Sequence, residues 1–249
     1  MQFSDIILNA LAVIIILAIH EYSHALIACK LGDNTAKYMG RLTLNPLKHI
    51  DPFGALCMVL FRFGWAKPVP VNLRSLKKPK RDFAIIALAG PASNLILSFL
   101  TVPFYLLTLL LFNFLVGKFE IQNELLINIL NYTLEFIFIF HAINLGIAIF
   151  NLIPIPPLDG SRIIASVLPT KAYIAYLKRE RIFYYALLGW LLLGNIVSNF
   201  LLSIPIVHNS TILSILANIV SLSKILSYAI EFLSGIFFDF WELIPFLNI

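Results

Sequence analysis

Long apolar runs separated by polar segments dominate the chain. The first run begins at Ile6 and the second at Phe83, and each is long enough to cross a bilayer, which takes about 20 apolar residues. The pattern predicts an all-α polytopic membrane protein with four to six transmembrane helices. The expected helices cover residues 6–29, 83–116, 129–158 and 182–207, with a possible fifth at 211–236.

Composition supports a membrane protein. Hydrophobic residues make up 60% of the chain and charged residues only 12%, whereas soluble domains contain about a quarter charged residues. This balance excludes a disordered chain, a coiled coil and a soluble core. The apolar runs leave no room for a separate soluble domain, so we expect a single transmembrane domain over residues 1–249.

The positive charges lie on two loops that should share one side of the membrane. Of the 18 Lys and Arg residues, 11 lie between Lys30 and Arg81 and five between Arg162 and Arg181. Two expected crossings separate these segments, and the positive-inside rule makes their side cytoplasmic. We therefore expect a protein of the cell membrane with its N-terminus outside. The same distribution explains the basic charge without nucleic acid.

The C-terminal region allows two interpretations. Polar residues recur every three or four positions from Ser214 to Ser234, which predicts one helix with a polar stripe. That helix could span the membrane or lie in its interface.

The segment between the first two expected helices has a different pattern. Residues 40–72 mix Gly and Pro with short extended runs, which predicts membrane-associated β-hairpins or a re-entrant segment. An exposed edge there could pair with an unwound substrate strand. The alternative is a lid that only seals the helix bundle.

The first expected helix carries an HExxH motif, His20-Glu21-Tyr22-Ser23-His24. Residues four apart lie on the same helix face, so both imidazoles can bind one metal ion, with Glu21 beside them as a general base. Such polar groups are costly in hydrocarbon unless they are paired, ligated or hydrated. The alternative is a buried polar cluster that joins helices.

A catalytic zinc site needs a third protein ligand. Asp159 is the only acid in the proline-broken segment from Asn151 to Gly160. Broken backbone at membrane depth is tolerated where it lines protein or a watery cavity. His20 lies about 21 Å along the helix from Ile6, at a depth similar to that of Asp159, toward the cytoplasmic side. By itself, Asp159 could equally be a residue of a helix-end turn.

Three motifs together resemble the site-2 protease family of intramembrane zinc metalloproteases. They are HEYSH at 20–24, GPASN at 90–94 and NLIPIPPLDGSR at 151–162, and the resemblance covers about residues 5–170. The chain looks like the small branch without PDZ or CBS domains. The resemblance implies one Zn²⁺ per chain on His20, His24 and Asp159, and cleavage of transmembrane protein substrates within the lipid bilayer.

The resemblance also implies roles for three further residues. Glu21 would activate water, Asn151 would stabilise the oxyanion, and Asn94 would support the site or bind substrate. Asn151 could instead cap the end of the broken helix, and the Asn94 amide could pack against or bridge neighbouring helices. Gly90-Pro91 is expected to kink the helix or permit close packing. We expect His49 to make a loop contact and His141 to be a hydrogen-bonded core residue.

The leading functional prediction is therefore a membrane zinc metalloendopeptidase. One alternative is a catalytically silent scaffold or escort of the same fold, which could lose Glu21 freely. Another is a metal transporter, which would need polar groups along a continuous path, whereas the ionisable groups here cluster at one end.

Overall fold

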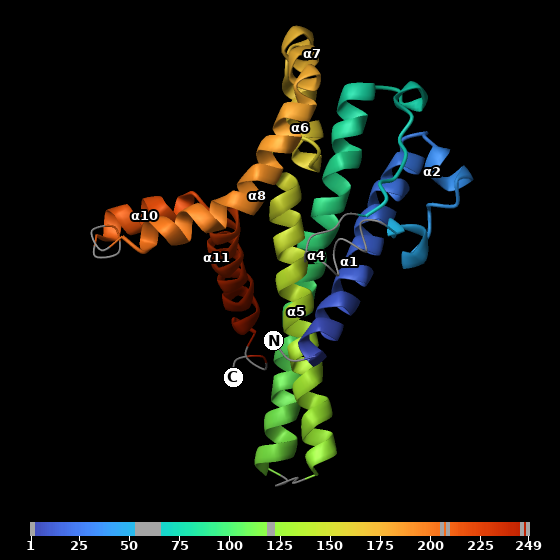
Figure 1. Ribbon diagram of the computed structural model, residues 1–249. Helices are drawn as coiled ribbons and strands as arrows, with labels where there is room; N and C mark the ends of the chain where they lie inside the picture. The colour runs from blue at the N-terminus through green and yellow to red at the C-terminus, as the bar shows by residue number, and fades with distance from the viewer. Residues whose placement is uncertain are drawn as a thin grey trace.

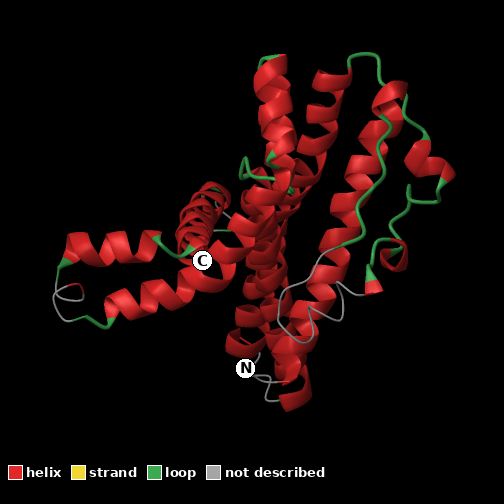
Figure 2. Ribbon diagram, turned by 45° about the horizontal axis from the view of Figure 1, so that its top comes forward, coloured by secondary structure: helices red, strands yellow, loops and turns green. Residues whose placement is uncertain are grey.

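The computed structural model describes residues 3–52, 66–118, 123–204, 207, 210–244 and 247, and these are almost entirely helical or turn (Figures 1 and 2). In chain order the helices are α1 (Phe3–Lys30), α2 (Thr35–Tyr38), the 3₁₀ turns η1 (Pro46–Lys48) and η2 (Leu73–Ser75), α4 (Pro79–Asn113), the π-helical turn η3 (Phe114–Lys118), α5 (Glu124–Leu152), α6 (Asp159–Val167), α7 (Thr170–Lys178), α8 (Glu180–Leu202), α10 (Thr211–Ile219) and α11 (Leu222–Glu242).

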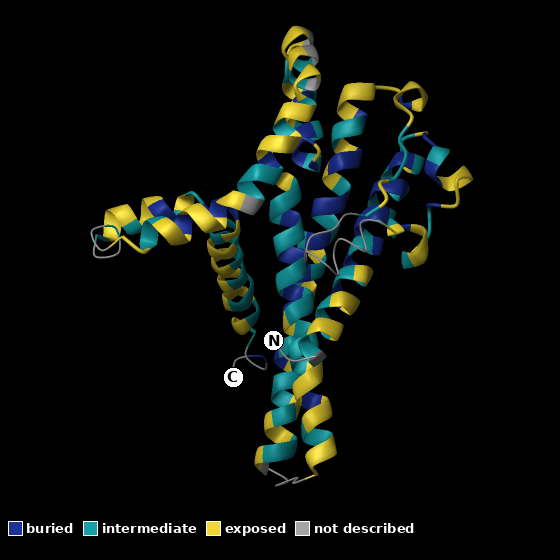
Figure 3. Ribbon diagram, in the orientation of Figure 1, coloured by how far each residue is buried: buried dark blue, intermediate teal, exposed yellow. Residues whose placement is uncertain are grey.

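Helices α1, α4 and α5 form the body of the molecule (Figure 1). All three are long and apolar enough to cross a membrane, and two bent helical segments, α8 and the α10–α11 pair, raise the possible number to five. The predicted helical fold of a multi-pass membrane protein is confirmed for the described residues, with three to five candidate spans where four to six were expected. Buried positions gather on the faces where the three helices meet (Figure 3), while their outer faces remain apolar and exposed.

The interface of α4 and α5 contains a buried polar contact. His141 of α5 is 1% exposed, and its Nδ1 lies 3.0 Å from the carbonyl oxygen of Ser98 on α4. Its Nε2 lies 2.9 Å from the hydroxyl of Ser234 on α11. His141 therefore joins three helices, as expected for a hydrogen-bonded core histidine.

The third expected helix ends earlier than predicted. Its predicted end was residue 158, but α5 stops at Leu152 because Pro154, Pro156 and Pro157 cannot donate the backbone hydrogen bonds of a continuing helix. A turn follows, and α6 begins at Asp159.

The expected helix at 211–236 is also corrected. It is two helices, α10 and α11, bent by 104° at Val220 and Ser221. The Ser221 side chain accepts from the backbone N–H of Lys224 and so begins α11. The Lys224 ammonium group donates to Ser198 on α8 and Asn218 on α10. Polar residues of the predicted stripe therefore meet at the bend.

The predicted β-hairpins in residues 40–72 are not supported. The described part of this segment contains no strand, only an isolated antiparallel bridge between Ile50 and Ala66, and residues 53–65 lie outside the described residues. Pro68 and Pro70 lack the N–H groups of a strand ladder. Residues 67–72 instead run as an extended strap along α1 (Figure 2).

Candidate metal centre

Two histidines on α1 provide the base of the site. His20 and His24 are 4% and 7% exposed, and their Nε2 atoms lie 3.0 Å apart. The rings meet edge to face, with centroids 4.6 Å apart. This follows from the four-residue spacing, which stacks both side chains on one face of the helix.

Asp159 reaches the same point from a distant part of the sequence. Its Oδ2 lies 3.2 Å from Nε2 of His20, a residue 139 positions earlier, and 3.3 Å from Nε2 of His24. The structure therefore brings together the three predicted ligands. They form the one group of three or more His, Cys, Asp or Glu side chains, among the described residues, that could hold a metal ion.

The break after α5 places Asp159. A side chain at Gly160 would clash with the carbonyl groups of Leu152 and Ile153, so glycine lets the first turn of α6 pack against the end of α5. The Tyr176 hydroxyl donates to the carbonyl of Pro154 at 2.9 Å and braces the turn from α7. The proline-rich turn therefore separates α5 from α6 and leaves the Asp159 carboxylate at the first position of α6.

The donor set fits zinc. Zinc binds imidazole nitrogen and carboxylate oxygen at about 2.0–2.2 Å, and tetrahedral geometry then separates neighbouring ligand atoms by about 3.3–3.6 Å. The three separations of 3.0, 3.2 and 3.3 Å lie at or just below this range. Two imidazoles and a carboxylate leave a fourth position for water or substrate, as in catalytic zinc sites.

The surroundings fix the orientation of His24. Its Nδ1–H donates to the carbonyl of Ile86 on α4 at 2.7 Å, because only a protonated nitrogen can pair with a carbonyl oxygen. The Nε2 lone pair is then directed into the site, the usual arrangement of a metal-binding histidine. The Nδ1 of His20 is buried and has no hydrogen-bond partner in the part of the chain that the structure describes.

Gly90 allows α4 to approach the site. A side chain there would collide with the imidazole rings of both His20 and His24. The expectation of close packing at Gly90 is therefore confirmed, and it explains the glycine of the GPASN motif. The motif marked this position in the sequence, but its partner could not be read from it.

Glu21 lies beside the ligands and is 9% exposed. Its Oε2 accepts a hydrogen bond of 3.0 Å from the backbone N–H of Val69 in the strap. The sequence did not predict this contact between Val69 and Glu21, because every residue except proline carries the same backbone donor. The one signal was its position between two prolines in Pro68-Val69-Pro70.

Asn94 and Asn151 do not join the three-ligand cluster. Asn151 is half-buried in the last turn of α5 and donates to the carbonyl of Ile147 at 3.0 Å. Asn94 is completely buried one turn beyond Gly90, and its Nδ2 has no hydrogen-bond partner among the described residues. Neither side chain hydrogen-bonds to His20, His24 or Asp159 within the described ranges.

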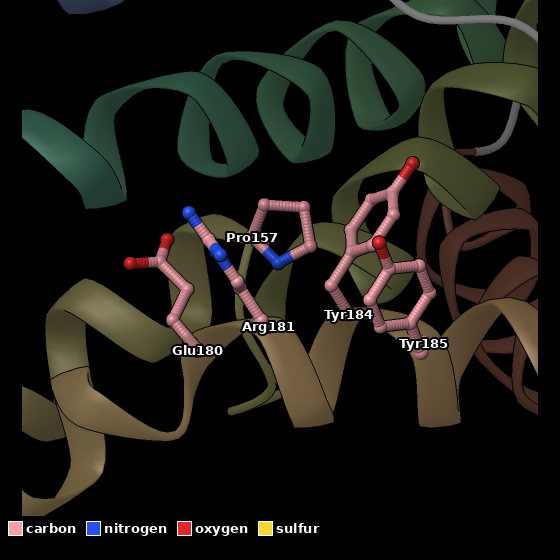
Figure 4. Close-up of a pocket in the computed structure, with 5 residues that line it drawn as sticks. All are labelled: Pro157, Glu180, Arg181, Tyr184 and Tyr185. Atoms are coloured by element: carbon pink, nitrogen blue, oxygen red, sulfur yellow. The ribbon is translucent and has the colours of Figure 1, made fainter.

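His49 lies away from the cluster. Its Nε2 contacts the carbonyl oxygen of Thr43 at 2.8 Å, which confirms the expected loop contact. A separate pocket lies between Pro157 of the proline-rich turn and the first turns of α8, and none of the three ligands or Glu21 lines it (Figure 4). It is lined by Pro157, Glu180, Arg181, Tyr184 and Tyr185.

The fold and the cluster define a multi-pass membrane protein with a buried His–His–Asp metal-ligand set beside a glutamate. The sequence model of peptidase family M50 matches residues 8–194, so the chain belongs to this family, that of the site-2 proteases. The resemblance found in the three motifs is thereby confirmed.

Two curated relatives carry names of zinc metalloproteases. YwhC of Bacillus subtilis is 43% identical over 159 residues, which cover 64% of this chain and 68% of YwhC. Rip2 of Mycolicibacterium smegmatis is 38% identical over 88 residues, which cover 34% of each chain. No solved structure matches the chain.

Proposed function

We propose that the protein is an intramembrane zinc metalloprotease that hydrolyses a peptide bond in or near the transmembrane helix of a membrane protein substrate. The observation that carries this proposal is the convergence of His20, His24 and Asp159 within 3.3 Å of one another, with Glu21 adjacent in sequence. Family membership and the names of both relatives support a metalloprotease.

His20, His24 and Asp159 would hold one zinc ion per chain. When bound, zinc supplies a Lewis acid and lowers the pKa of a coordinated water. Glu21 would accept the proton from the attacking water and later deliver it to the leaving amine, the usual exchange of roles for a general base. Asn151 would donate its amide N–H to the oxyanion, which requires Nδ2 to leave the carbonyl of Ile147.

The proposed orientation places the N-terminus outside the cell membrane and the site toward the cytoplasmic side. Lys80 at the start of α4 donates to the carbonyl of Leu168 at 3.3 Å and lies 5.3 Å from the ring centre of Tyr173. Arg162 similarly lies over the ring of Phe83 at 5.7 Å. These contacts join the two basic segments, which supports their placement on one side of the bilayer. In this proposal residues 1–249 form a single transmembrane domain.

Asn94 would support the site, because a completely buried amide cannot reach a substrate without movement of α4. Its position one turn beyond Gly90, which lies against both histidines, favours this role over direct substrate binding.

The main alternative is a silent scaffold of the same fold, and Glu21 distinguishes the two. We expect Glu21→Gln to keep zinc and lose cleavage, since general base catalysis contributes about 10²–10⁴-fold. Membrane proteins whose fragments appear in cells with the wild type and are absent with Glu21→Gln identify the substrates. Equal fragment patterns from both variants would support the scaffold.

A further inference from the structure

The strap, residues 67–72, contacts the functional carboxylate directly. The backbone N–H of Val69 donates to Oε2 of Glu21 at 3.0 Å. Glu21 is 9% exposed and the bond is partly buried, so it is shielded from water more than a surface hydrogen bond would be. Bonds to charged groups are also stronger than bonds between neutral groups.

The sequence makes Val69 the sole backbone donor at this point of the strap. Pro68 and Pro70 have no N–H, and each fixes its own φ near that of extended polyproline. A proline also holds the preceding residue in an extended conformation, which restricts Val69. The strap is therefore stiff where it meets Glu21.

The strap is anchored on both sides of Val69. The N–H of Lys67 donates to the carbonyl of His49 at 2.8 Å. The N–H of Asn72 donates to Oδ2 of Asp33 at 2.6 Å. Asp33 is completely buried just beyond the end of α1, and its Oδ1 accepts from the backbone of Thr35. The donor at Val69 is thus fixed relative to the helix that carries Glu21.

We propose that the backbone N–H of Val69 is a positioning group for Glu21. It holds Oε2 and fixes the rotation of the carboxylate, which leaves Oε1 as the proton acceptor. A general base works only when it lies within hydrogen-bond reach of the proton that it removes, so a freely rotating glutamate would spend less time in the reactive geometry. This inference rests on the proposed function, because it assumes that Glu21 is the base.

The first test measures the bond without any substrate. Hydrogen–deuterium exchange of the peptide containing Pro68, Val69 and Pro70 reports the Val69 amide in wild type, Glu21→Gln and Glu21→Ala. We expect slow exchange in wild type and Glu21→Gln, where an acceptor oxygen remains, and at least about tenfold faster exchange in Glu21→Ala. Equal rates in all three proteins would overturn the proposal.

The second test removes the donor and measures catalysis. The substrate is a tagged single-span membrane protein that the wild type cleaves and Glu21→Gln does not. Val69→Pro lacks the N–H, whereas Val69→Ala keeps it. We expect Val69→Pro to retain zinc and KM while kcat falls by at least about tenfold, the worth of a hydrogen bond to a charged group. Val69→Ala measures the effect of losing the side chain alone, and its loss of kcat should be clearly smaller than that of Val69→Pro, because the backbone donor survives.

A backbone ester at Val69, introduced as the corresponding α-hydroxy acid, covers the case in which Val69→Pro fails to fold. It removes only the N–H, and we expect the same loss of kcat. An ester variant with wild-type kcat would overturn the positioning role and leave the protease intact. If Glu21→Gln cleaves as well as wild type, or if wild type cleaves no membrane protein, the proposed function itself fails and the positioning role fails with it.

Discussion

Gly90 of α4 lies so close to His24 of α1 that a single methyl group at Gly90 would collide with the imidazole ring. His24 in turn donates from Nδ1 to the carbonyl of Ile86, one turn earlier on α4. Helix α4 therefore packs closely against His24 and also fixes its orientation, although His24 belongs to α1. The metal centre depends on the packing of these two helices as much as on the HExxH motif.

Gly90→Ala tests this dependence. The added methyl group would occupy the space of the His20 and His24 imidazole rings, so it should displace these rings or push α4 away from α1, and overpacking of this kind costs about 1–3 kcal/mol. We expect reduced zinc content and loss of cleavage. The control is Gly189→Ala on α8, where the structure leaves open space, and it should keep zinc at the wild-type level. Wild-type zinc in Gly90→Ala, measured by atomic absorption, would contradict the packing account.

Gly160→Ala tests the placement of the third ligand. The new side chain would clash with the backbone of Leu152 and Ile153, so α6 should move and carry Asp159 away from the histidines. We expect weaker zinc binding, measured by competition with a chelator of known affinity. Gly235→Ala on α11, another helical glycine with open space, serves as the control. An unchanged zinc affinity would show that the close approach at Gly160 does not position Asp159.

His141→Ala tests whether His141 has a structural role and no part in binding the metal. The substitution removes the imidazole that joins the Ser98 backbone carbonyl on α4 to the Ser234 hydroxyl on α11, whereas the Ser98 hydroxyl keeps the backbone carbonyl of residue 141 as its acceptor. Each lost hydrogen bond costs about 0.5–1.5 kcal/mol. We expect lower resistance to unfolding in detergent mixtures while the folded protein keeps its zinc. A loss of zinc from folded His141→Ala would show that His141 participates in the metal centre.

The sequence was most informative where the chemistry is local. His20, Glu21 and His24 could be identified because the HExxH spacing alone places them on one helix face. Asp159 could be proposed because it is the sole acid on a proline-broken segment, and family resemblance supported it. Close packing at Gly90 could be expected, but its partners His20 and His24 could not be derived, because they depend on which helix packs against α1.

The bend between α10 and α11 shows the limit of periodicity. Residues 211–236 contain no proline, and the one glycine, Gly235, lies far from the bend, so one amphipathic helix was the natural prediction. Contacts with α8 override that preference, since Trp190 Nε1 donates to the carbonyl of Val220 at 2.8 Å and a side chain at Gly194 would meet the same carbonyl. Such contacts form only after α8 has been placed, and they are not visible in the sequence pattern.

Zinc stoichiometry tests the central claim most directly. The wild type, His20→Ala and Asp159→Ala would be purified in detergent and analysed for metal, with folding verified by circular dichroism. The account predicts about one zinc per wild-type chain, because three ligands from one cluster hold one ion, and loss of zinc in both variants. Zinc that persists in folded Asp159→Ala, or a folded wild type that binds none, would contradict it.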